Sequence, residues 1–293
     1  MVTVGLLGFI VLGLTAMFVH TQKVFRAGIT QSDVLEAGRA AMDLMVHDLE
    51  GTTPSRIPTV TNFLSRYEAD STNSLTGSTF PRTNVLSCFY FLNEYNHAWK
   101  GVGYVVAVPD AFIASYKVGT LYRFEFPPGG YSEVASLETN SLEFKTNALA
   151  AINRLVAPTN YGASPNISAY LTRVCDGVIH LRVKAYDTTG LAISPTNLPL
   201  NTLVVTNASQ RNAFVEFPPF NATLGMEEYT CTNNAVPAYL DLELGILDVR
   251  AWERFKAIPN ATAQQAYLTR QANAIHVFRR RVAVQNFDLE AYP

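Results

Sequence analysis

An uninterrupted apolar segment opens the chain. None of its first nineteen residues is charged, and the first charged side chain is Lys23. A helix needs roughly 20 apolar residues, at about 1.5 Å each, to cross the hydrocarbon core of a membrane, so the segment is long enough. A secretory signal peptide would show basic residues before the apolar run and a cleavage site of small residues after it, and neither flanks this run. The pattern therefore predicts a retained helix that inserts into a membrane.

A second helical pattern follows in residues 31–50, where apolar side chains recur at spacings of three and four residues. Asp33 and Glu36 have the spacing of a capping box, so this helix either starts anew at Asp33 or continues from the apolar segment as one piece. Gly51 and Pro54 predict its end. The face expected to pack on the rest of the protein is formed by Val34, Ala41, Met45 and Leu49, with Leu35, Met42 and Val46 beside them.

The rest of the chain carries strand patterns that are rich in β-branched and aromatic residues. Residues 119–126 alternate between apolar and polar side chains, and Asp241 and Glu243 alternate with leucines. Residues 52–83 are rich in Thr, Ser and Asn, which predicts a long surface excursion. The expected strands are 84–92, 102–108, 119–126, 177–186, 238–244 and 276–284, and the expected later helices are 142–155 and 262–274.

These elements predict an α+β fold, in which a long amino-terminal hydrophobic helix packs on a globular domain built around an antiparallel β-sheet. The division is expected near residue 50: residues 1–50 form the helix, and residues 51–293 form an exported β-rich globular domain. With 48% hydrophobic and 11% aromatic residues, that second part is long enough to build a sizeable core.

Charge and cysteine content narrow the possible partners. The formal net charge is -2, so no global basic field would gather nucleic acid, and none is expected as a partner. The three cysteines lie far apart in the sequence, which allows at most one internal disulfide and makes a zinc site improbable. Cys175 and Cys231 both lie in the strand-rich second half, so we expect them to form that disulfide if one exists.

No constellation of catalytic or metal-binding residues is visible. The five histidines lack metal-ligand spacing, and the chain contains neither a Gly-x-Ser-x-Gly elbow nor a phosphate-binding loop. Asp43 and Asp48 are five residues apart and do not share a helix face, which makes them poor partners for acid–base chemistry. Asp176 near a turn could join a calcium site, although no ligand series accompanies it. We therefore expect no enzymatic activity, no cofactor and no metal.

The order of these features resembles type IV pilin-like proteins, particularly the J-type minor pseudopilins of type II secretion and the W-type minor pilins. The similarity rests on the uncharged helix, on its amphipathic continuation through residues 39–49, and on two strand patterns at residues 174–187 and 236–244. It implies a structural subunit of a type IV pilus or a secretion pseudopilus, processed at Met1. Its partners would be other copies or other pilin-like subunits, and the inner membrane before assembly.

The resemblance also implies where the chain acts and which residues matter. The apolar helix would first insert in the inner membrane and then form the core of an extracellular or periplasmic filament. Pilins usually carry a glutamate where this chain has Gly5, so the usual partner for a neighbour's amino terminus is missing. The alternative is a single-pass membrane-anchored exported protein, either an adhesin-like binding protein or an enzyme. The implied filament-core positions are Met1, Gly5, Leu6, Phe9, Leu12, Leu14 and Phe18.

Overall fold

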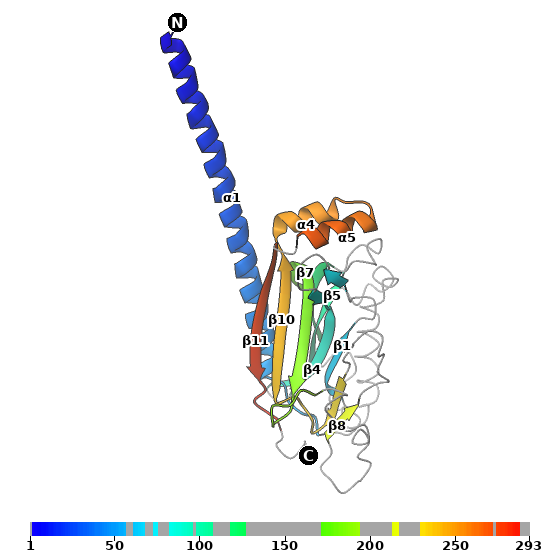
Figure 1. Ribbon diagram of the computed structural model, residues 1–293. Coiled ribbons are helices and arrows are strands. Elements are labelled where there is room, and N and C mark those ends of the chain that lie inside the picture. The colour runs from blue at the N-terminus through cyan, green and yellow to red at the C-terminus, as the bar shows by residue number, and fades with distance from the viewer. Residues whose placement is uncertain are drawn as a thin grey trace.

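The computed structural model combines one long helix with an antiparallel sheet (Figure 1). It describes residues 2–56, 61–67, 73–75, 82–95, 98–107, 118–126, 171–193, 213–216, 229–271 and 274–287. The described helices are α1 (Val2–Glu50), α4 (Val249–Lys256) and α5 (Ala261–Arg270). These elements make the fold α+β, as the sequence predicted.

Nine strands form the main sheet in the order β11-β10-β7-β6-β5-β4-β1-β9-β8, and every neighbouring pair is antiparallel. A separate pair joins β2 and β3. The strands are β1 (Thr61–Tyr67), β2 (Asn73–Leu75), β3 (Arg82–Asn84), β4 (Ser87–Tyr95), β5 (Ala98–Ala107), β6 (Gly119–Phe126), β7 (Leu171–Tyr186), β8 (Ala213–Glu216), β9 (Tyr229–Asn233), β10 (Tyr239–Leu247) and β11 (Ile275–Ala283).

Helix α1 is one continuous element with two different surroundings. Its amino-terminal part projects away from the domain, and its carboxyl-terminal part lies along the sheet beside β11 and β10 (Figure 1). The packed part buries the predicted face, with each of the four residues at most 2% exposed. They share one hydrophobic core with side chains of β1, β4, β5, β7 and β10. The four residues are Val34, Ala41, Met45 and Leu49.

The expectation of membrane insertion is wrong. Within the part of the chain that the structure describes, no helix has both the length and the apolar character needed to cross a membrane. This finding overturns the predicted localisation, in which α1 inserts before assembly.

The structure also corrects the interpretation of residues 52–83 as a surface excursion. Strand β1 lies within that range and pairs with β4 on one side and β9 on the other, so it belongs to the interior of the sheet. Phe63 and Leu64 of β1 are buried. The many polar residues nearby hid a strand whose only aliphatic or phenylalanine side chains are the central Phe63 and Leu64. The expected helix at 142–155 lies outside the described residues.

A second, smaller core closes one end of the sheet under α4 and α5 (Figure 1). Trp252 and Phe255 of α4 stack with ring centroids 5.6 Å apart and are both buried. Side chains cap both helices: Asp248 accepts from the backbone N–H of Arg250, and Asn260 accepts from that of Thr262. The expected helix at 262–274 is therefore present as α5, whereas α4 was not predicted.

Close packing inside the sheet gives a first prediction, at Gly103 of β5. A Cβ added there would lie 2.1 Å from the ring of Phe124, which is 1% exposed and has no room to move. We expect Gly103→Ala to lower the free energy of unfolding by about 1–3 kcal/mol, the usual cost of overpacking a core. Chemical denaturation measures it. Gly28→Ala is the control, because Gly28 has no neighbour within 4 Å, and a loss as large there would contradict the packing explanation.

Candidate functional site

The part of α1 that leaves the domain is the most unusual surface of the molecule. We call residues 2–29 the projecting segment. Its described large apolar side chains are open to solvent: Leu12 is 72% exposed, Phe18 64% and Phe25 70%. The described side chains between residues 5 and 25 are exposed on all sides of the helix. An isolated apolar surface of this extent marks an interaction site.

The structure places the predicted filament-core residues on this segment, where it describes them. Gly5, Leu12, Leu14 and Phe18 are exposed, and a Cβ at Gly5 would meet nothing within 4 Å. Met1 lies outside the described residues, as do the side chains of Leu6 and Phe9.

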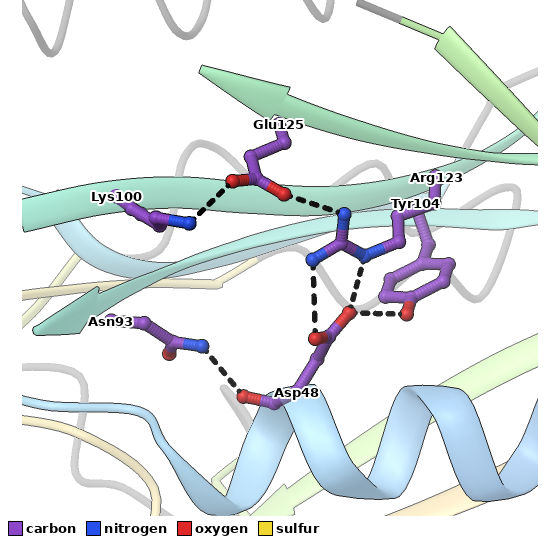
Figure 2. Close-up of polar contacts among 6 residues, drawn as sticks. All are labelled: Asp48, Asn93, Lys100, Tyr104, Arg123 and Glu125. Carbon is purple, nitrogen blue, oxygen red and sulfur yellow. Dashed lines mark hydrogen bonds and ion pairs between the residues drawn. The ribbon is translucent and has the colours of Figure 1, made fainter. Parts of the chain in front are cut away.

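A partly buried network of charged groups joins the other end of α1 to the sheet (Figure 2). Asp48, in the last turn of the helix, accepts hydrogen bonds from Tyr104 Oη at 2.6 Å and Arg123 Nε at 2.6 Å through Oδ2, and from Arg123 Nη2 at 3.2 Å through Oδ1. Tyr104 on β5 and Arg123 on β6 are direct partners in the sheet register. One helical carboxylate therefore binds two adjacent strands at once.

The network continues outward along the sheet. Arg123 Nη1 donates to Glu125 Oε2 at 2.7 Å, and Lys100 Nζ donates to Glu125 Oε1 at 2.8 Å. These hydrogen bonds, the one from Lys100 first, lower the pKa of Glu125 below its ordinary value. Burial by itself lowers the pKa of Arg123, but hydrogen bonds to Asp48 and Glu125 raise it. Charges therefore alternate along the chain of contacts, so each buried group has a compensating partner.

Backbone contacts complete the attachment. Asn93 Nδ2 donates to the main-chain oxygen of Asp48 at 2.8 Å, which satisfies one of the free carbonyl groups at the helix end (Figure 2). The N–H of Thr53 donates to the oxygen of Leu92, so the chain leaving the helix pairs with β4. The end of α1 is thus fixed to three strands by charge and by main-chain hydrogen bonds. We call this set of contacts the helix joint.

The chemistry of the helix joint is that of a structural connection. Burial first, and then the charge of Asp48, raise the pKa of Tyr104, so its hydroxyl stays protonated and donates to the carboxylate. Both oxygens of Asp48 are engaged by donors. Among the described residues, no three His, Cys, Asp or Glu side chains are grouped so that they could hold a metal ion.

The pKa of Glu125 makes a prediction about acid stability. Because its folded pKa lies below the ordinary value of 4.5, the unfolded state binds more protons in this range. The stabilisation is therefore complete above about pH 4.5 and is lost as the pH falls through the lower folded value. Urea unfolding between pH 7 and pH 3 should show a smaller pH dependence for Glu125→Gln than for wild type. Glu50→Gln, at an exposed position, is the control, and equal slopes for wild type and Glu125→Gln would contradict the prediction.

The expected disulfide is not formed: Cys175, Cys231 and Cys88 are all buried thiols outside any disulfide. Cys175 lies on β7 and Cys231 on β9, and four other strands separate these two in the sheet. A disulfide needs two Cα atoms within about 7 Å of each other. That distance is larger than one strand spacing but far smaller than the five strand spacings between β7 and β9. The sequence placed both cysteines in the second half of the chain, but this position does not show how far apart their strands lie in the sheet.

Buried thiols that form no disulfide should be unreactive until the protein unfolds. Burial raises the pKa of Cys175 to about 12, so almost no thiolate is present at neutral pH. We expect iodoacetamide to modify none of the three cysteines in the native state and all three in guanidinium chloride. Mass spectrometry after a short pulse provides the measurement. A non-reducing peptide map that shows a bridged pair would overturn the assignment.

Other charged residues also have structural partners. Asp176 binds Arg173 through both of its carboxylate oxygens and accepts from Thr120 at 2.7 Å, so its carboxylate is already compensated. Arg280 pairs with Asp43 of α1 at 2.6 Å, and Arg281 binds Asp241 through two donors at 2.7 and 2.8 Å.

Among the described residues, His180 is the one buried histidine. Its Nδ1 accepts the backbone N–H of Val85 at 3.0 Å, so Nε2 carries the proton and faces Glu243 at 3.2 Å. Glu243 also meets Arg279 at 3.1 Å. This histidine therefore holds the residues before β4 against β7, and its two ring nitrogens serve the fold.

Sequence reasoning missed Arg123 and Tyr104 and dismissed Asp48. A signal was present in β6: Leu121 and Arg123 are two residues apart and therefore share a face, and Leu121 belongs to the main core. A charge on the buried face of a strand requires an opposite charge nearby. That partner could not be found from sequence, because Asp48 is 75 residues away in the chain.

Comparison of the chain with protein-family models, with curated proteins and with solved structures gave no match.

Proposed function

We propose that this chain is a structural subunit of a filament of the type IV pilus or type II secretion pseudopilus kind, and that it assembles through its amino-terminal helix. The observation that carries this proposal is the projecting segment, an apolar helix with no charged side chain before Lys23, which extends from a folded domain with its described side chains in solvent (Figure 1). The resemblance in element order to pilin-like proteins favours the same function.

The distribution of apolar side chains favours many neighbours over one. An amphipathic helix buries one stripe, whereas a helix that is apolar all round must be covered from several sides. Leu7, Leu14 and Phe18 are each more than 60% exposed, and burying one such side chain contributes about 1.5–3 kcal/mol. Several like helices packed around each segment would provide that cover.

The helix joint supports a repeating assembly. Because Asp48, Arg123 and Tyr104 fix the end of α1, every copy would present its domain in the same orientation to the helix axis. Helices that pack in parallel then need an axial shift so that their domains do not collide. Repeating one such shift generates a helical array.

Sedimentation of the purified chain tests the proposal. The full chain, diluted out of mild detergent, is expected to form pelletable polymers that electron microscopy shows as filaments. The control lacks residues 1–28 and retains the whole buried part of α1, so it should stay folded by circular dichroism and remain in the supernatant. A full chain that stays monomeric, or that forms only irregular aggregates, would refute the filament proposal.

A further inference from the structure

Opposite charges gather on opposite sides of the folded domain. Strands β7, β10 and β11 turn one face away from α1, and we call this face the outer face. Arg279 and Arg281 on it are 67% and 62% exposed at the side chain, so both are open to solvent. Basic groups outnumber acidic ones there. The ionisable residues of the outer face include Arg182, Lys184, Arg279 and Arg281 against Asp241 and Glu243.

The exposed side of α1 carries the complementary charge. Glu36, Asp43 and Glu50 are spaced by seven residues, which places them on one stripe along the helix. All three are exposed, and we call them the acidic stripe. Within the described residues, Asp43 has an ion-pair partner in Arg280, whereas Glu36 and Glu50 have none. Arg39 is exposed between Glu36 and Asp43 and offsets part of this charge, so the three carboxylates leave this side of the helix with a net negative charge.

The two surfaces point in opposite directions. Phe278 of β11 touches α1, since a Cβ added at Gly38 would lie 2.1 Å from its ring. Side chains alternate across a strand, so Arg279 and Arg281 point away from the helix. The acidic stripe lies on the far side of α1 from its buried residues, such as Met45. The sheet separates the two charged surfaces within one copy.

We propose that the acidic stripe of one copy binds the outer face of the next copy, with Glu36 or Glu50 meeting Arg279 and Arg281. Two different patches on opposite sides make a head-to-tail contact, which propagates into an open array unless the rotation closes a ring. Arg279 reaches Glu243 through Nε, which leaves its two Nη groups for a second carboxylate. The inference rests on the proposed filament and assigns it a lateral contact between domains.

Charge reversal with rescue tests the contact. The double variants Glu36→Lys with Glu50→Lys, and Arg279→Glu with Arg281→Glu, should each reduce the pelleted fraction about tenfold at low salt, since like charges then face one another. Mixing the two variants should restore pelleting in part, because each supplies the reversed partner of the other. Arg250→Glu with Arg254→Glu is matched in charge change and lies on exposed positions of α4, so it should have little effect.

A cross-linking measurement separates this inference from the filament proposal. Arg279→Lys supplies an amine that a carbodiimide can couple to a carboxylate, and mixing heavy and light isotope-labelled copies identifies links between molecules. A link from position 279 to Glu36 or Glu50 of another copy supports the contact, whether or not filaments pellet. Circular dichroism confirms that each variant folds. The contact would be overturned if both charge-reversal variants pelleted to the same extent as wild type. It would also be overturned if no such link formed at high protein concentration.

Discussion

Leu12→Lys is expected to abolish assembly of the full chain. Leu12 lies in the middle of the projecting segment and is 72% exposed in the single copy. In a bundle of like helices its position would be surrounded by apolar side chains, where an ionised amine without a partner costs several kcal/mol. Each copy in the array would carry that cost, so we expect the pelleted fraction to fall by more than about a hundredfold. Sedimentation at equal protein concentration measures it.

Two further variants make this result specific. Gln31→Lys adds the same charge at an exposed position beyond the projecting segment and should leave assembly intact. Gly5→Glu introduces the residue that pilins usually carry, into space with no neighbour within 4 Å in the single copy. It should be neutral or strengthen assembly, because a neighbour's amino terminus would compensate the carboxylate. Equal polymer from Leu12→Lys and wild type would show that the segment does not form the core.

The sequence predicted the elements well wherever local periodicity was strong. The expected strand at 119–126 matches β6 at both ends, and the amphipathic stripe of residues 31–50 selects side chains that are buried. The strand at β1 was missed because Thr61 and Asn62 begin it with polar residues, although Asn62 is buried and donates to the oxygen of Ala235. Such a contact joins residues 173 positions apart, so no local pattern reveals it.

The candidate site divides in the same way. The projecting segment is a local property of composition, and the sequence showed it directly. The helix joint depends on which strands lie side by side, and its members Asp48 and Arg123 come together only when β5 and β6 pair beneath the end of α1. The predicted disulfide failed for the same reason, because two cysteines can lie in the same half of the sequence and still be on strands that are not neighbours in the sheet.

Removing the carboxylate of the helix joint should destabilise the whole domain. Asp48→Ala leaves Arg123 without its main partner and Tyr104 without an acceptor, in a site where the two charged side chains are only 10% and 20% exposed. Breaking a buried pair by removing one member costs about 3–5 kcal/mol, and since Glu125 still compensates Arg123 we expect a value near the lower limit. Urea unfolding followed by circular dichroism provides the measurement.

The matched control is Asp43→Ala, one and a half turns earlier on the same helix. Asp43 pairs with Arg280, but both side chains are more than half exposed, so its loss should cost about 0–1 kcal/mol. Hydrogen exchange distinguishes the two variants further: Asp48→Ala should increase amide exchange over residues 41–50, where α1 lies on the sheet, and Asp43→Ala should not.

A double-mutant cycle tests the pairing directly. Asp48→Ala combined with Arg123→Met should lose less stability than the sum of the two single losses, because Arg123→Met removes the charge that Asp48→Ala leaves unpaired. Additive losses, or equal losses for Asp48→Ala and Asp43→Ala, would mean that apolar packing alone holds the helix end and that the projecting segment is not fixed in orientation by charge.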